Sequence, residues 1–395
     1  MGYGTGDFHR ILMWAPPSGS SVMASPMKTL LTSIKPWQLV LLAAIAYLAT
    51  VSASTQGDPF AFIRIGSRFD PGIPDGTMGY DGQFSYQIAV SPIDSVSKLD
   101  VPAYRLQRIL YPALARIAAM GNRQLIPWAL VAINLAALAF GVRATEAILT
   151  LYGQSCWWAL AYGLNVAMFM SVRLDLTEPT AYLFVQLGAL AWAKHRHRTS
   201  ALAFCFASLA KEVTLLIALG YLLAKLRADG PRAALKWGLV AFLPFVLLQG
   251  ILAMWLGSIG IASGGAMSTP FEVVPLHAWW AVAGYDIPKF LTLSILVVPL
   301  ILIPAAAGIL VSCRALAKGF VQPSALSLVV QSIAFLFLPA SNLLDPLAAS
   351  RFSIGLIAAF LTFGAARNHR RVLAYTQLWL LTLAFLPGDN FLPSG

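Results

Sequence analysis

The stretch of this sequence with the most chemical content is Gly79 to Ala89, GYDGQFSYQIA, which follows the first long apolar run. Asp81 stands there between a tyrosine and a glycine, in an expected turn that leads into a short helix over 82–89. A carboxylate held at a membrane surface can accept a proton from a hydroxyl group as a general base. The alternative is that Asp81 only caps the helix of residues 82–89. The residue types alone leave both interpretations open.

A second acidic pair is Asp175 and Glu178, in the segment RLDLTEP. Residues three apart share a face if the segment is helical, so the pair would suit a divalent cation such as Mg²⁺ or Mn²⁺, or would orient a substrate. The alternative is a cap of the following helix, with Thr177 or Glu178 just before Pro179. Carboxylates at a membrane edge are expensive, which favours the functional interpretation.

The composition indicates an all-α integral membrane protein. The chain has 395 residues, of which 58% are hydrophobic and 11% charged, whereas a soluble domain has about 25% charged residues. A net charge of +11 would suggest nucleic acid for a soluble protein, but membrane proteins keep excess Lys and Arg on cytoplasmic loops, so no nucleic-acid partner is expected. The three cysteines form no CxxC pair, so neither a zinc site nor a disulfide framework is indicated.

Apolar runs predict a bundle of about eleven membrane spans, which make up a polytopic domain over 37–395. The runs are 37–53, 125–142, 156–170, 180–193, 199–210, 213–224, 238–256, 291–312, 322–339, 352–366 and 372–386. With a cytoplasmic N-terminus and alternating sides, every short basic cluster falls inside, as the positive-inside rule requires. Residues 1–36 are expected to be a disordered or mis-started cytoplasmic segment, because Met23 or Met27 is an alternative start.

Two of these runs are shorter than a membrane span. The runs 199–210 and 213–224 are each too short to cross some 30 Å straight. They form either a hairpin with a tip at Lys211-Glu212 recessed in the membrane, or one long broken helix.

Two long loops are expected outside the cytoplasm, at 54–124 and 257–290. In the first, residues 102–119 read as one amphipathic helix in the interface plane, with Arg105, Arg108 and Arg116 on its polar side. No GxGxxG, P-loop, HExxH or GxSxG motif occurs, so soluble nucleotide chemistry is not supported.

Residues 79–112 resemble the GT-C class of membrane glycosyltransferases. The segments YDGQFSYQIA and RLQRILYP are similar to YDGQFYYxIA and RxxRILYP of bacterial cell-surface glycopolymer proteins and to the branch near GPI mannosyltransferase II-type proteins. One departure is Ser85, where the bacterial relatives usually have Tyr; it is expected to alter an acceptor contact rather than the chemistry.

The resemblance implies a GT-C-like bundle with interfacial helices in the first extracytoplasmic loop, and a donor sugar linked to a polyprenyl phosphate. Asp81 matches the acidic residue that the class uses as catalytic base. Transfer would be inverting, to an extracytoplasmic lipid or cell-surface glycan, in the inner membrane. The candidate substrate-binding residues are Tyr80, Gln83, Tyr86, Arg105, Arg108, Asp175, Glu178, Lys211, Glu212, His277 and Arg351.

Cations in this set would stabilise a phosphate leaving group. Arg105, Arg108, Lys211 and Arg351 are the extracytoplasmic candidates, and each has the alternative of reaching lipid headgroups. Lys211 either reaches the phosphate or forms a self-neutralising pair with Glu212. His277 lies among aromatic residues that first indicate an interfacial belt.

Two other classes of function compete with the enzyme. A transporter or flippase of lipid-linked glycans would tend to bury ionisable residues at the midplane and to show repeats. The sequence has no visible repeat and places nearly all predicted charges at span ends, which favours the enzyme. In a non-catalytic scaffold for envelope assembly, Asp81 would be dispensable.

Overall fold

The computed structural model describes residues 34–386 except 71 and 74. The predictions for residues 1–33 and for the final segment 387–395 lie outside the described residues. The regular secondary structure of the described residues is all helical, with no strand. It therefore agrees with the predicted all-α class.

Five described helices are long and apolar enough to cross a membrane, which fits an all-α membrane protein. They are α2 (Pro36–Ser54), α7 (Ile126–Leu151), η3 with α12 (Glu212–Leu256), α14 to α15 (Ile287–Ala317) and α18 (Pro346–Ala366). The apolar helix α16 (Pro323–Leu336) is shorter.

The predicted number of eleven spans is not confirmed, because two of the apolar runs do not form single helices. The run 156–170 is divided into η2 (Cys156–Ala159), α8 (Leu160–Gly163) and α9 (Val166–Arg173). The run 372–386 is divided into α19 (Arg370–Thr376) and the 3₁₀ segment η7 (Gln377–Phe385).

The chain makes a hairpin at Lys211, one of the two arrangements expected for 199–224. Helix α11 (His197–Ala210) ends where Lys211 adopts an extended conformation, and η3 (Glu212–Thr214) leads into α12 (Leu215–Leu256). Phe204 and Tyr221 lie on the two sides of this turn with ring centroids 4.6 Å apart. The two helices therefore run back along each other.

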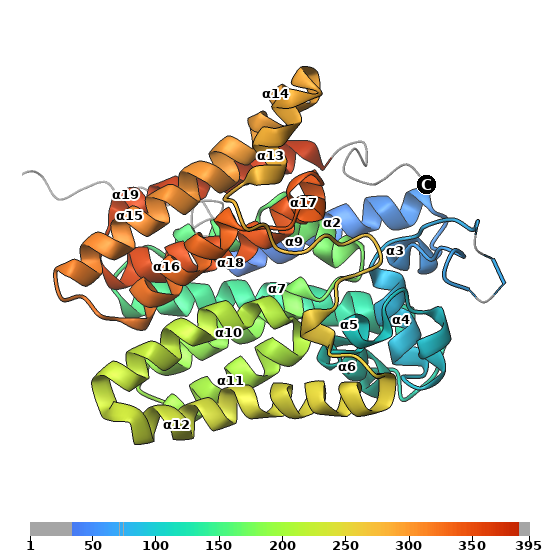
Figure 1. Ribbon diagram of the computed structural model, residues 1–395, viewed down its shortest axis with the longest axis horizontal. Helices are drawn as coiled ribbons and strands as arrows, with labels where there is room; N and C mark the ends of the chain where they lie inside the picture. The colour runs from blue at the N-terminus through green and yellow to red at the C-terminus, as the bar shows by residue number, and fades with distance from the viewer. Residues whose placement is uncertain (1–33, 71, 74, 387–395) are drawn as a thin grey trace, which may run out of the picture. The chain divides into compact units, whose positions relative to one another are not determined.

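A second reversal lies inside α12. Gly230 has φ +82° and ψ 176°, which is not helical, and Pro231 follows it. Tyr221 and Trp237, on opposite sides of Gly230, both pack on the ring of Trp192, with centroids 5.3 and 6.1 Å away. Helix α12 thus consists of two arms that meet at one end of the bundle (Figure 1), and the arms correspond to the predicted runs 213–224 and 238–256.

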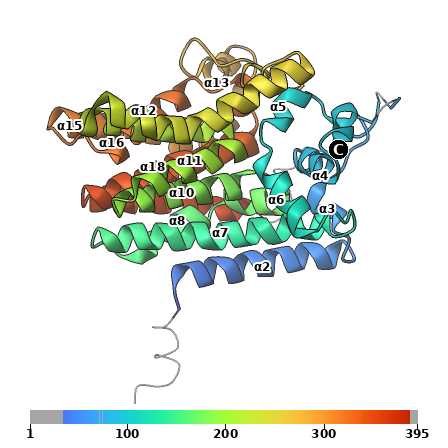
Figure 2. The same ribbon diagram turned by 90° about the horizontal axis from the view of Figure 1, so that it is seen from below.

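The long helices pack through small residues. Helix α2 lies along α7 at one side of the bundle (Figure 2), and α10 (Glu178–Ala193) packs against both α7 and α11. A Cβ atom on Gly220 of α12 would lie 2.4 Å from the backbone nitrogen of Ser327 in α16. Only glycine allows these two backbones to approach so closely, as small residues do at many membrane helix contacts.

The first predicted loop forms short helices that gather at one end of the bundle (Figure 1). They are α3 (Phe60–Ile63), α4 (Gly82–Val90), η1 (Asp94–Lys98), α5 (Pro102–Leu106) and α6 (Leu110–Ala118). The prediction of one amphipathic helix over 102–119 is wrong, because α5 and α6 are separate. Arg105 and Arg108 are buried rather than exposed, since carboxylates inside the protein neutralise them.

The second predicted loop is mostly irregular. It contains η4 (Gly260–Ala262), α13 (His277–Ala281) and η5 (Val282–Gly284). The next helix begins at Ile287, as α14 (Ile287–Val297), and passes through a π-helical turn, η6 (Val298–Leu302), into α15 (Ile303–Ala317). A further short helix, α17 (Ala340–Leu343), precedes α18.

Candidate functional site

Asp81 does not cap α4, although it stands at the N-cap position. Its backbone is already helical, with φ −56° and ψ −26°, and its side chain makes no capping hydrogen bond. Instead its two carboxylate oxygens accept from two arginines on different elements: Oδ1 lies 3.0 Å from Nη1 of Arg105, and Oδ2 lies 2.9 Å from Nη1 of Arg351. The capping alternative is therefore not what the structure has.

Two neighbours of Asp81 fix its position. A Cβ atom on Gly82 would lie 2.1 Å from the carbonyl oxygen of Leu174, so only glycine lets α4 approach the α9–α10 connection. The side-chain amide of Gln83 accepts from the Gly66 nitrogen at 3.0 Å and donates to the Met78 carbonyl at 3.0 Å. Gly82 and Gln83 thus fix the position of the turn that contains Asp81.

The two arginines that flank Asp81 each have a second carboxylate partner. Arg105 makes two bonds of 2.7 Å to Asp100, and Arg351 bonds through Nε to Glu178. Glu178 also accepts from Lys211 at 2.7 Å. These contacts make one continuous chain of ion pairs that runs in the order Asp100, Arg105, Asp81, Arg351, Glu178, Lys211.

A separate ion pair lies beside this chain. Arg108 donates to both oxygens of Glu212, at 2.8 and 2.6 Å, and to the hydroxyl of Tyr104 at 2.6 Å. The alternative of a self-neutralising Lys211–Glu212 pair is not what the structure has, because Lys211 bonds Glu178 and Glu212 bonds Arg108. Lys211 has an extended backbone and Glu212 begins the 3₁₀ turn η3, and the two side chains have different partners.

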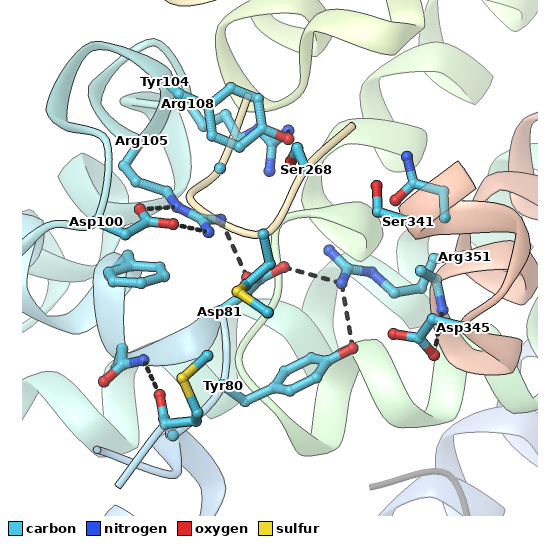
Figure 3. A pocket seen from close by; sticks show the side chains of 18 of the residues that line it. Tyr80, Asp81, Asp100, Tyr104, Arg105, Arg108, Ser268, Ser341, Asp345 and Arg351 are labelled. Atoms are coloured by element: carbon cyan, nitrogen blue, oxygen red, sulfur yellow. Dashed lines mark hydrogen bonds and ion pairs between the residues drawn. The ribbon is translucent and has the colours of Figure 1, made fainter. Parts of the chain in front are cut away.

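Asp81 is the member of the chain that faces open space. Its side chain is 30% exposed, against 0 to 12% for the other charged side chains described above. It lines a cavity of about 410 Å³ (Figure 3). Figure 3 shows Arg105 and Arg351 approaching Asp81 from opposite sides of this cavity. The polar lining residues are Arg64, Tyr80, Asp81, Gln83, Asp100, Tyr104, Arg105, Arg108, Lys211, Ser268, Ser341, Asn342, Asp345 and Arg351.

The charges around the cavity keep Asp81 ionised. Burial raises the pKa of Asp81, but the charges of Arg105, Arg351 and Arg108 outweigh this and hold the pKa far below its ordinary value. Asp100 behaves in the same way: its burial is outweighed by Arg105, so its pKa is lowered. The site therefore carries fixed charges of both signs at neutral pH.

Asp175 and Glu178 do not act as a pair. Asp175, with a left-handed φ of +51°, is fully buried against Tyr111, whose hydroxyl lies 3.4 Å from Oδ1. Glu178 points instead to Lys211 and Arg351. The two carboxylates thus share no space for a divalent cation, and the described residues contain no group of three His, Cys, Asp or Glu side chains that would hold one.

The remaining predicted residues fall into two sets. Tyr80 lines the cavity, with its hydroxyl 3.4 Å from Nη1 of Arg351. Tyr86 lies on another face of α4, against Phe60, and lines a separate hollow of about 280 Å³. His277 bonds Glu272 at 3.4 Å and does not line the cavity of Asp81.

Seven of the polar residues that line the cavity were not predicted: Arg64, Asp100, Tyr104, Ser268, Ser341, Asn342 and Asp345. Three of them have a definite structural role. Asp100 holds Arg105 and also accepts from the Ala266 nitrogen at 3.1 Å, which ties the second loop across the cavity. Tyr104 stands four residues before Arg108, a helical spacing that could have indicated their contact. Asp345 caps α18 just before Pro346, a recognisable helix start.

No protein-family model matches this chain, and no curated protein or solved structure matches it either. The geometry of the site and the resemblance of residues 79–112 therefore carry the proposed function.

Proposed function

We propose that this chain is a membrane glycosyltransferase that transfers a sugar from a polyprenyl-phosphate donor to an extracytoplasmic lipid or cell-surface glycan. The observation that carries the proposal is Asp81, an ionised carboxylate in a cavity of about 410 Å³ between two buried guanidinium groups. A base beside cations is what transfer from a phosphate leaving group needs.

The proposed reaction is a single displacement with inversion. The acceptor hydroxyl loses its proton to Asp81 while its oxygen forms a bond to the anomeric carbon. The bond from that carbon to the phosphate oxygen breaks, and its electron pair stays on the polyprenyl phosphate. The leaving phosphate gains one negative charge, which Arg105 and Arg351 would stabilise. Water then takes the proton from Asp81 and restores the carboxylate.

The proposal includes a GT-C-like arrangement in an inner membrane. Helices α3 to α6 would lie at the extracytoplasmic surface as interfacial helices, and the bend of α12 at Gly230 would lie on the cytoplasmic side, beside Lys225 and Asp229.

This sidedness can be tested by labelling with an impermeant thiol reagent in intact cells. In a background without Cys156, Cys205 and Cys313, cysteines at the exposed residues Ser97 and Ser268 should be labelled, and one at the exposed residue Thr199 should not. Ser200 would be unsuitable because it is fully buried. Labelling of Thr199 with no labelling of Ser97 would reverse the orientation and exclude an extracytoplasmic site.

The activity is tested by incubating the purified protein with polyprenyl-phosphate sugars and a mixture of membrane glycans. We expect release of free polyprenyl phosphate together with a glycosylated product. A lipid-linked glycan flippase is the alternative, since the eight charged residues that form ion pairs at the cavity could also hold a headgroup in transit. A flippase would move the donor across liposomes that contain the protein and leave the sugar–phosphate bond intact.

A further inference from the structure

The charges around the cavity are balanced before any substrate arrives. Four cations, Arg105, Arg108, Lys211 and Arg351, are all within ion-pair distance of four carboxylates, Asp81, Asp100, Glu178 and Glu212. A phosphate that enters this site would add negative charge to a set that is already neutral. Either one carboxylate has to give up its cations or the phosphate binds weakly.

Asp81 is the carboxylate most easily displaced. Its contacts with Arg105 and Arg351 are single bonds of 3.0 and 2.9 Å, whereas Asp100 holds Arg105 with two bonds of 2.7 Å. If Asp81 turns away, Arg105 keeps Asp100 and Arg351 keeps Glu178. Because neither buried guanidinium would then be left unpaired, the displacement avoids the largest penalty for breaking a buried ion pair.

The position of Asp81 also resembles that of a bound anion. Its two oxygens are shared between two guanidinium groups that come from different elements, α5 and α18. Two oxygens of a phosphate would meet the same two donors. The 30% exposure of the Asp81 side chain means that an anion in the cavity can reach the donors from the open side.

We infer that the Asp81 carboxylate occupies the phosphate-binding site between Arg105 and Arg351 in the free protein, and that a polyprenyl phosphate displaces it on binding. This inference rests on the proposed function for its choice of ligand. Asp81 thus has a second role: its carboxylate occupies Arg105 and Arg351 until the donor phosphate binds to them.

The displacement would also turn a weak base into a stronger one. The charged and titratable groups that line the cavity or pair with those that do are Arg64, Tyr80, Asp100, Tyr104, Arg105, Arg108, Glu178, Lys211, Glu212, Asp345 and Arg351. The charges of Arg105 and Arg351 are the two largest causes that lower the pKa of Asp81. A phosphate that neutralises these guanidinium groups lets the pKa of Asp81 rise, so proton transfer from the acceptor becomes easier only when the donor is present.

The test measures binding of farnesyl phosphate, a short polyprenyl monophosphate, to the purified full chain in detergent. Farnesol serves as the uncharged probe for contacts of the lipid chain alone. The variants are Asp81→Asn and, as a matched control, Asp345→Asn. Asp345 lines the same cavity and has the same side chain, but its carboxylate caps α18 through the Leu347 and Ala348 nitrogens and forms an ion pair with neither of the arginines that hold Asp81.

We expect Asp81→Asn to bind farnesyl phosphate about tenfold more tightly than the unmodified protein, since a competing charge-assisted contact is gone. Asp345→Asn should gain several-fold less, and farnesol should bind all three proteins equally. Weaker or unchanged binding by Asp81→Asn would overturn the inference, and so would an equal gain by Asp345→Asn. Asp81→Ala is the second variant: it should gain affinity in the same direction, provided that its melting temperature shows a folded protein.

This result is separable from that of the proposed function, because the binding test involves no turnover. A gain in affinity without glycosyl transfer from any donor would support the displacement of Asp81 and contradict the proposed enzyme activity. Glycosyl transfer without a gain in affinity would support the enzyme activity and contradict the displacement.

Discussion

Asp81 and Asp175 are two aspartates in connections that lead into helices, and their surroundings are opposite. Asp81 lies between two guanidinium groups and faces a cavity, while Asp175 is fully buried beside the hydroxyl of Tyr111. Burial raises the pKa of both, but only at Asp81 do nearby cations reverse the direction. The ionisation of each carboxylate is therefore set by its neighbours, which come from distant parts of the chain.

Asp175 belongs to a buried hydrogen-bond network around the Tyr111 hydroxyl. The Tyr111 hydroxyl lies 3.0 Å from the Leu130 carbonyl oxygen and accepts from Asn134 at 2.8 Å, and Asn134 also donates to the Leu176 carbonyl. In the described part of the chain, Oδ2 of Asp175 has no hydrogen-bond partner. Asp175 thus belongs to a packed polar network that joins α6, α7 and the α9–α10 connection, and we expect it to be protonated and structural.

The largest expected effect is that of Asp81→Asn on glycosyl transfer. An amide has no useful basicity, so loss of the base should reduce turnover by about 10² to 10⁴. The measurement is polyprenyl phosphate release with saturating donor, with the melting temperature as a control for folding. Near-normal transfer by a well-folded Asp81→Asn protein would remove Asp81 as the base.

The next effect is that of Arg351→Ala on donor binding. Arg351 is the residue that joins Asp81 to Glu178, so its removal takes away one of the two guanidinium groups of the proposed phosphate-binding site. We expect donor affinity to fall by about 2–3 kcal/mol. The matched control is Arg116→Ala, because Arg116 bonds only the carbonyls of Ala89 and Val90 and lies away from the cavity. Equal donor affinity in both variants would assign Arg351 to a purely structural role.

The helical class and the place of Asp81 in the candidate site could be predicted from the sequence, because both depend on local information. A run of apolar residues indicates a helix without reference to anything else, and YDGQ is a contiguous segment. The resemblance that led to Asp81 covers residues 79–112, which all belong to one end of the bundle.

Most pairings in the site could not be predicted, because they join residues far apart in sequence. Arg351 meets Asp81 across 270 positions, and Glu212 meets Arg108 across 104. Spacing suggested the neighbours Lys211 with Glu212 and Asp175 with Glu178, and both pairs are separated in the structure. Local spacing fails here because a buried charge selects its partner by three-dimensional proximity.

Gly82→Ala tests how the two aspartates are held apart. The new methyl group would lie 2.1 Å from the Leu174 carbonyl oxygen, one residue before Asp175, so α4 would have to shift. We expect a loss of about 1–3 kcal/mol of stability from overpacking, together with reduced transfer as Asp81 moves. Gly250→Ala is the control, since a Cβ atom there has nothing within 4 Å. Equal melting temperatures of the two variants would mean that this contact relaxes freely.

The smallest effect is expected for Asp175→Asn. Asparagine has the shape of a neutral carboxyl group and tolerates a left-handed backbone as well as aspartate does, so stability measured at about pH 4, where the unfolded chain still holds much of its proton, should change by less than about 1 kcal/mol. The pH dependence separates the two aspartates further. Because burial raises the pKa of Asp175, the folded protein keeps a proton that the unfolded chain releases, and stability falls as pH rises above about 4. Asp81 has the opposite sign: its lowered pKa stabilises the fold above about pH 4, and this stabilisation is lost as pH falls. Between pH 5 and pH 8, the melting temperature of Asp175→Asn should therefore increase relative to that of the unmodified protein as pH rises. A variant that loses stability, or glycosyl transfer, at every pH would show that Asp175 works as an ionised group, and the contrast with Asp81 would be wrong.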